Sequence, residues 1–217
     1  PVISVMGMQV CPIPTAILST HTGGFGEVSQ RDLTDYMEPC LDHYRKVGLE
    51  FECIYTGYLS SPDQVAHCLQ FFDSWPGALK VVDPVMGDHG KLYRAFTREM
   101  VEGIGRMARK AQVITPNLTE AAILLGEAPA AGALSTAAAR SMLARLGELG
   151  PEKVVVTGVT LATGEYVNLC YDREHNSFWK SVGDYIPVHY PGTGDIFAAV
   201  LTASLLQGDS LPLAMDR

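Results

Sequence analysis

The chain has 217 residues, 47% of them hydrophobic and 18% charged, which is the composition of a folded domain and excludes an intrinsically disordered chain. Its formal net charge of −8, without any cluster of Lys or Arg, argues against nucleic acid or a membrane surface as a partner. The five cysteines are widely spaced and include no Cys-x-x-Cys pair, so they indicate reduced core residues of a cytoplasmic protein. The longest apolar run, residues 196–206, is too short to cross a bilayer.

Short β-rich runs alternate with helical patterns along the chain, which is typical of a mostly parallel sheet with helices on both faces. The predicted strands are residues 10–19, 51–57, 79–85, 112–117 and 153–158. The predicted helices are residues 30–47, a helix that begins at Ser61, a third that contains residues 100–107, and a fourth from Ser135 to Leu149. Residues 164–187 predict a hairpin. We therefore expect one α/β domain over residues 1–217, a three-layer α/β/α sandwich.

Polar residues follow nearly every predicted strand, and the carboxyl ends of the strands are where an open parallel sheet binds its ligands. Asp83 follows a continuous apolar run, where a charge is expensive to bury without a ligand, a metal or a cationic neighbour. Asp88 lies in a glycine-containing loop and fits a turn as well as a functional role. Asn117 and Glu120 stand three residues apart across a strand-to-helix junction, so they either share a binding face or cap the helix.

Two further segments offer groups that could bind a ligand. Thr157 and Gly158 end the predicted strand 153–158 with a hydroxyl and an open backbone, which suits phosphate oxygens but also a plain turn. The loop STHTGGFGEV, residues 19–28, contains His21 and Thr22 and has the character of a ligand loop. A lone histidine in a polar loop is more often hydrogen-bonded than catalytic, so we assign no proton transfer to His21.

The most informative stretch is YPGTGDIFAAVLTASLL, residues 190–206. Gly192, Thr193 and Gly194 stand directly before Asp195, and an apolar helix pattern follows at once. The unpaired N–H groups of such a helix start attract an anion. If the anion is a phosphoryl group in transit, Asp195 is placed to take a proton from the attacking hydroxyl. An ordinary helix start is the alternative interpretation.

In their order and spacing, TGYLSS, DPVMGD, TPNLTEA, VVVTG and PGTGDIFAA resemble the ribokinase superfamily, and within it the pyridoxal/pyridoxamine kinases. STHTGG and TGYLSS favour a vitamin B6 kinase over a sugar kinase, and Asp195 stands where hydroxymethylpyrimidine kinases usually have Cys. The resemblance covers nearly the whole chain. It implies a ribokinase-like fold and ATP-dependent phosphorylation of the 5′-hydroxymethyl group of pyridoxal, pyridoxamine or pyridoxine.

The resemblance also assigns the chemical step. It implies that Asp195 is the general base on the substrate hydroxymethyl group. The amides of Gly192, Thr193 and Gly194 are implied to stabilise the negative charge that develops during transfer.

The same resemblance implies a nucleotide site and a substrate site. Asp83 and Glu120 are the implied ligands of Mg²⁺ or of its waters. The positions implied around the ATP phosphates are Asp83, Asp88, Asn117, Glu120, Thr157 and Gly158. His21, Thr22 and Tyr58 match substrate-binding positions. A monovalent cation is common in the superfamily, but nothing in the sequence identifies its ligands.

The two ends of the chain depart from the family pattern. Such kinases have a strand and a serine-containing loop before the position of Pro1, and further helices after that of Arg217. We therefore expect residues 1–217 to lack the N-terminal strand and C-terminal helices of the kinase domain. The complete protein is expected to be a homodimer.

Three other functions stay open at this point. Another kinase of the superfamily, acting on hydroxymethylpyrimidine, a sugar or a nucleoside, shares the phosphoryl-transfer residues. A non-catalytic pyridoxal carrier needs the pocket and the anion site but no base, so Asp195 distinguishes it from a kinase. A dinucleotide-binding oxidoreductase is disfavoured, because the G-x-G-x-x-G pattern counted from Gly192 has Phe197 at its sixth position.

Overall fold

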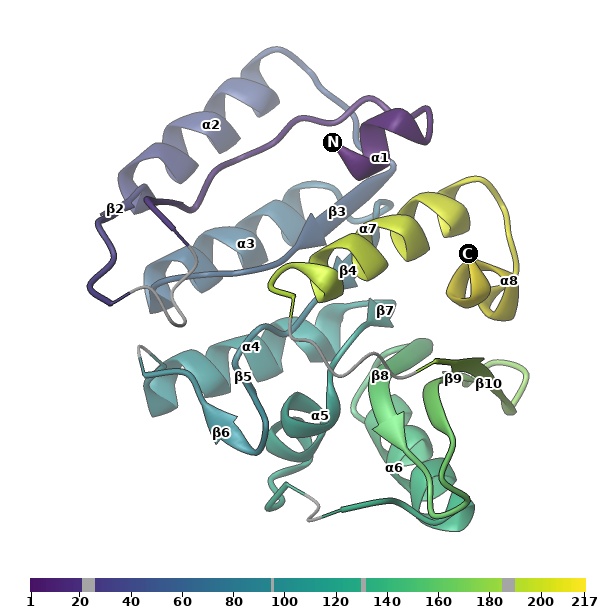
Figure 1. Ribbon diagram of the computed structural model, residues 1–217. Coiled ribbons are helices and arrows are strands. Elements are labelled where there is room, and N and C mark those ends of the chain that lie inside the picture. The colour runs from purple at the N-terminus through teal and green to yellow at the C-terminus, as the bar shows by residue number, and fades with distance from the viewer. Residues whose placement is uncertain (21–25, 95, 130–131, 185–189) are drawn as a thin grey trace.

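The structure is a computed structural model that describes residues 1–217 except 21–25, 95, 130–131 and 185–189 (Figure 1). Its centre is a six-stranded sheet with the strand order β10-β9-β8-β7-β4-β3. These strands are β3 (Cys53–Thr56), β4 (Leu79–Val82), β7 (Val113–Ile114), β8 (Lys153–Thr160), β9 (Tyr166–Asp172) and β10 (Ser177–Gly183). Neighbours from β3 to β8 pair in parallel, and β9 and β10 continue the sheet as the predicted antiparallel hairpin. The mostly parallel sheet is thus confirmed.

Helices cover both faces of this sheet. They are α1 (Val2–Val5), α2 (Thr34–Lys46), α3 (Pro62–Ser74), α4 (Arg98–Lys110), α5 (Leu118–Leu125), α6 (Thr136–Glu148), α7 (Thr193–Leu206) and α8 (Leu211–Asp216). Val82 and Ile114 pack with α3, α4, α5 and α6, whereas their neighbours Val81 and Val113 pack with α7 and α8. Because successive side chains of a strand alternate between two buried faces, these strands are mostly apolar, with Lys80 of β4 as the exception.

Local sequence signals account for the helix ends. Ser61 and Ser135 are the N-caps of α3 and α6, and each side chain accepts a hydrogen bond from a backbone N–H three residues on. Gly48 follows α2 with a φ of +70°, the left-handed conformation that favours glycine after a helix. The predicted starts at Ser61 and Ser135 are confirmed.

The prediction of a strand over residues 10–19 was wrong in length and in place. Only β1 (Ala16–Leu18) is a strand, and it pairs with β2 (Gln30–Asp32) in a separate antiparallel ladder outside the central sheet. Pro12 and Pro14 have no N–H to donate to a ladder, so the strand begins after them. The helix predicted from residue 30 begins at Thr34, because β2 occupies residues 30–32.

The predicted end of a strand at Gly158 was also wrong. Strand β8 continues to Thr160 past a register shift between Val156 and Val159. A bulge of this kind lets a strand pass an unpaired residue without ending, which no local turn signal reveals. The strands predicted at 79–85 and 112–117 are shorter in the structure, because their last residues form the loops of the candidate site.

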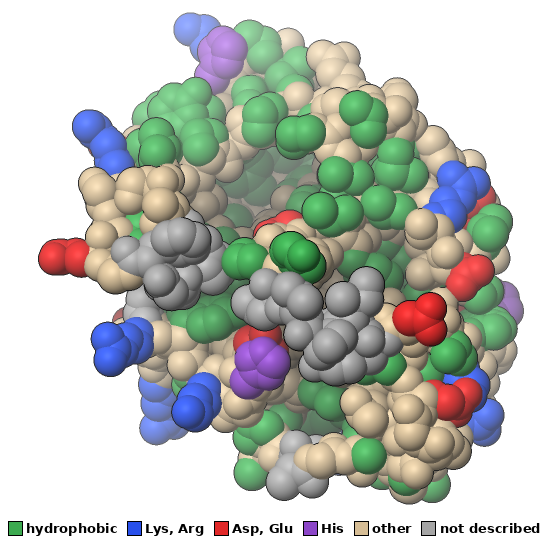
Figure 2. Space-filling model, in the orientation of Figure 1, with side chains coloured by type: hydrophobic (Ala, Val, Ile, Leu, Met, Phe, Trp, Pro, Cys, Tyr) green, Lys and Arg blue, Asp and Glu red, His purple; other side chains and the backbone are tan. Residues whose placement is uncertain are grey.

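The exterior adds two observations. On the face drawn in Figure 2, Lys and Arg side chains lie as scattered groups at the rim, and the described residues of this face form no continuous basic patch. No helix within the described part of the chain is both long and apolar enough to cross a membrane.

Candidate active site

The candidate site lies where the parallel strands end. The parallel ladder extends one residue past β4 and β7, because Asp83 donates its N–H to the Thr56 carbonyl (2.9 Å) and Thr115 donates its own to the Val82 carbonyl (3.1 Å). Residues far apart in the sequence therefore lie side by side at one edge of the sheet. This is the edge at which such sheets bind ligands.

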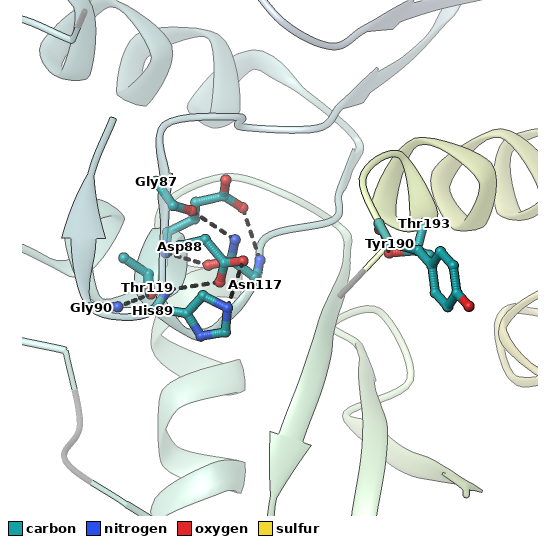
Figure 3. A network of polar contacts seen from close by, with 9 residues as sticks. Gly87, Asp88, His89, Gly90, Asn117, Thr119, Tyr190 and Thr193 are labelled. Carbon is teal, nitrogen blue, oxygen red and sulfur yellow. Dashed lines mark hydrogen bonds and ion pairs between the residues drawn. The ribbon is translucent and has the colours of Figure 1, made fainter. Parts of the chain in front are cut away.

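Asn117 and Glu120 form a capping box at the start of α5. Asn117 Oδ1 accepts the Glu120 N–H (2.9 Å), and Glu120 Oε2 accepts the Asn117 N–H (2.9 Å). Glu120 Oε1 also accepts the Met86 N–H (3.1 Å), and Asn117 Nδ2 donates to the Gly87 carbonyl (2.8 Å; Figure 3). The two side chains thus fasten the loop after β4 to the helix, as the capping alternative predicted.

Asp88 belongs to a small hairpin formed by β5 (Gly87–Asp88) and β6 (Lys91–Leu92). Asp88 Oδ1 accepts the His89 N–H (2.7 Å), and Thr119 Oγ1 accepts the Gly90 N–H (2.8 Å; Figure 3). His89 takes a positive φ of +49°, so the aspartate supports a tight turn. Burial and, to a smaller extent, the carboxylate of Asp88 raise the pKa of Glu120, so Asp88 lies close enough to add to the negative charge of the site.

Asp83 is buried, with 8% of its surface exposed, and no described residue donates a hydrogen bond to its carboxylate or forms an ion pair with it. Burial, together with the charges of Glu120 and Asp195, holds the pKa of Asp83 well above its ordinary value. Burial also raises the pKa of Glu120 to about 7, although its backbone hydrogen bonds oppose this shift. An ionised Asp83 therefore requires a cation at this position.

Thr56 and Thr115 are buried residues that the sequence analysis did not single out. They stand on either side of Asp83, at 7% and 5% exposure, and neither hydroxyl has a hydrogen-bond partner among the described residues. Both lie in motifs that were noted, TGYLSS and TPNLTEA, and the available signal was that each follows or ends a strand. Oxygen atoms without partners fit the ligand preference of a hard cation such as Mg²⁺. Of the two, Thr115 stands beside Asp83 on the same face of the sheet, whereas Thr56 pairs with Val82 and faces the other side.

The first turn of α7 is exposed and uncapped. Gly192 is the N-cap, with a φ of +88°, and no side chain in the described ranges accepts a hydrogen bond from this turn. The backbone N–H groups of Thr193, Gly194 and Asp195 have no partner within the described residues, while Thr193 Oγ1 donates to the Tyr190 carbonyl (3.2 Å; Figure 3). As far as the described residues go, the turn therefore leaves N–H groups free at the positive end of the helix dipole, in line with the expectation from the sequence.

Thr157 and Gly158 lie inside β8. Thr157 donates its N–H to the Pro116 carbonyl (3.1 Å), next to the capping box. Gly158 has a φ of +67° and donates its N–H to Asn168 Oδ1 (3.1 Å). The expected open backbone at Gly158 was therefore wrong, because the bulge presents this N–H to β9.

The predicted substrate positions are only partly described. Tyr58 is half-buried, its ring meets that of Phe96 edge-on at 6.3 Å between centroids, and its carbonyl accepts a hydrogen bond from Thr15 Oγ1 (2.9 Å). His21 and Thr22 lie outside the described residues.

A cavity of about 470 Å³ opens between the N-terminal ends of α2 and α3, away from the acids described above. Its lining includes Asp32, Asp35, Glu38, Asp63 and His67. Four carboxylates repel phosphate, so this cavity is unsuited to a nucleotide.

The chain is similar to known proteins in sequence and in fold. The profile of the phosphomethylpyrimidine kinase family matches residues 2–217. A pyridoxal kinase of Arabidopsis thaliana is 30% identical over 217 residues, which cover 92% of this chain and 65% of that protein. The chain thus spans about two thirds of the length of this curated relative.

Two solved structures are similar over the whole chain. One is a Bacteroides thetaiotaomicron protein, provisionally assigned as a phosphomethylpyrimidine kinase and crystallised with pyridoxal; it is 44% identical with a TM-score of 0.93, and the match covers 76% of it. The other is pyridoxal kinase of Lactobacillus plantarum, 32% identical with a TM-score of 0.89 and 76% covered. The ribokinase-like fold expected from the motifs is confirmed.

Proposed function

Since the chain belongs to the phosphomethylpyrimidine kinase family, we propose that it transfers the γ-phosphoryl group of ATP to the 5′-hydroxymethyl group of pyridoxal, pyridoxamine or pyridoxine. The observation that carries this proposal is the start of α7, where the N–H groups of Thr193, Gly194 and Asp195 have no partner among the described residues. The similarity to pyridoxal kinases over the whole chain supports the choice of substrate class.

In the proposed reaction, Asp195 accepts the proton of the substrate hydroxyl while that oxygen forms a bond to the γ-phosphorus. The bond between the γ-phosphorus and the bridging oxygen breaks, and the electron pair leaves with ADP. The N–H groups of Thr193 and Gly194, with the conformation of Gly192, stabilise the charge on the transferred group. These donors need no reorganisation, because the helix already holds them.

Asp83 is the proposed carboxylate for Mg²⁺ or one of its waters, because it is buried and has no partner among the described residues. Mg²⁺ bound there would neutralise charge on the ATP phosphates. Glu120 and Asn117 hold the loop after β4. We therefore propose that Glu120 binds a water molecule of the metal and keeps the loop in place. Asp88 and Thr157 are proposed to lie near the phosphates.

The vitamer is proposed to bind near Tyr58 and the loop that contains His21 and Thr22. Two further predictions are that the protein binds a monovalent cation and that the complete protein is a homodimer.

Hydroxymethylpyrimidine is a second candidate substrate, because the matching family profile is that of the phosphomethylpyrimidine kinases. The deciding experiment measures ADP release by the full-length protein with pyridoxal, pyridoxamine, pyridoxine, hydroxymethylpyrimidine and several sugars. We expect the highest kcat/KM with a B6 vitamer. A higher kcat/KM with hydroxymethylpyrimidine would mean that this compound, and not a B6 vitamer, is the substrate. Tight pyridoxal binding without any ADP release would favour a non-catalytic pyridoxal carrier.

A further inference from the structure

Tyr55 lies in β3 on the face covered by α7. Its half-buried ring packs in the same cluster as Phe197 and Leu201 of that helix, and Figure 1 shows α7 running across β3 and β4. Its hydroxyl reaches toward the end of the strand, because a Cβ placed on Gly57 would lie 3.8 Å from Tyr55 Oη. The phenol therefore points at the edge where the candidate site lies.

Two carboxylates share this corner of the molecule with Tyr55. Tyr55 stands opposite Val81 in the parallel ladder, and Asp83, two residues further along, continues the ladder and faces the same side. Asp195 stands in the first turn of α7, two residues before Phe197, which packs in the same cluster. Burial and then the charges of Asp83 and Asp195 raise the pKa of Tyr55, so its hydroxyl keeps its proton at neutral pH.

The Tyr55 hydroxyl and the Asp195 carboxylate have no hydrogen-bond partner within the described part of the chain. A carboxylate in an exposed helical turn rotates freely unless a donor holds it, and a general base must point at the proton that it takes. Asp195 therefore needs a hydrogen-bond donor, whereas the buried carboxylate of Asp83 needs a cation.

We propose that Tyr55 is a positioning residue for phosphoryl transfer: with substrate bound, its hydroxyl donates a hydrogen bond to the Asp195 carboxylate and holds it toward the substrate hydroxyl. This inference rests on the proposed role of Asp195 as general base.

The test is Tyr55→Phe in the full-length protein, which keeps the ring packed against α7 and removes only the hydroxyl. We expect kcat to fall about 10- to 100-fold, as for losing a hydrogen bond to a charged group, with KM for vitamer and ATP changed less than about threefold. The matched control is Tyr44→Phe, which removes the phenol oxygen of a ring that packs with Leu41 and Phe71 between α2 and α3, and it should leave kcat within about twofold. A purely structural role of Tyr55 would instead lower the thermal midpoint or raise both KM values, and that result would overturn the inference.

A double-mutant cycle separates this inference from the proposed function. If Tyr55 acts through Asp195, then Tyr55→Phe added to Asp195→Asn should lower the residual rate by less than about twofold. A full additional loss, or a normal kcat in the single variant while Asp195→Asn is inactive, would overturn the role of Tyr55 alone. Near-normal turnover of Asp195→Asn would instead overturn the role of Asp195.

Discussion

Helices α5 and α7 both begin at the candidate site, and their first turns are built in opposite ways. At α5, Asn117 and Glu120 satisfy each other and the loop after β4. At α7, the N-cap is a glycine without a side chain, and the N–H groups behind it are free among the described residues. Since helix N-termini are normally satisfied by caps, water or ligands, the contrast indicates that α5 is scaffold and α7 is available to an anion.

The largest expected effect comes from the α7 side. Asp195→Asn should lower kcat by about 10²- to 10⁴-fold, the usual range for a positioned general base, with little change in vitamer or nucleotide affinity. Steady-state ADP release and equilibrium binding of pyridoxal measure the two quantities. Asp63→Asn, an exposed acid in the first turn of α3, is the matched control and should stay active. Near-normal turnover of Asp195→Asn would favour the carrier interpretation.

A substitution in the first turn of α5 should lower the stability of the fold. Glu120→Ala removes both acceptors that hold the Met86 and Asn117 amides, so we expect unfolding to become easier by about 3–4 kcal/mol in a urea titration. Glu127→Ala is the control, because its ion pair with Arg145 lies on the surface and should contribute less than about 1 kcal/mol. Equal stability of the two variants would mean that the capping box is not what holds this loop.

The stability of the protein should also depend on pH through Glu120. The pKa of Glu120 is raised to about 7 from an ordinary value of 4.5, so the folded state favours the protonated acid. Its contribution is complete below pH 4.5 and is lost as pH rises toward 7, by up to about 3 kcal/mol in the ligand-free protein. Unfolding of wild type and Glu120→Gln from pH 4.5 to 8 measures it, and the variant should lack this part of the slope. Parallel curves would contradict the raised pKa.

The smallest predicted effect concerns the metal. Asp83→Ala should raise the Mg²⁺ concentration for half-maximal rate about tenfold, in line with losing one group that positions a metal, and leave pyridoxal binding unchanged. Asp73→Ala, an exposed acid paired with Lys110, is the control. If the Mg²⁺ dependence of Asp83→Ala matches that of wild type, the buried carboxylate is structural.

Much of the fold and of the site could be predicted from short stretches of sequence. The caps at Ser61 and Ser135, the hairpin of β9 and β10, and the glycine turn before Asp195 all depend on neighbours within a few residues. Such features are decided by backbone conformation and local hydrogen bonds, which the residue types already specify. The place of Asp83 at a strand end followed in the same way from its apolar surroundings.

Only the tertiary structure decided which polar groups near the site have partners. Glu120 is occupied by the Met86 amide from another segment, and the Gly158 N–H is taken by Asn168 on β9. In the sequence, Tyr55 is an ordinary strand residue. Only the packing of β4 and α7 brings Asp83 and Asp195 near its hydroxyl. Hydrogen-bond satisfaction and burial depend on groups that are distant in sequence and meet only when the sheet and its helices pack, so no local pattern can specify them.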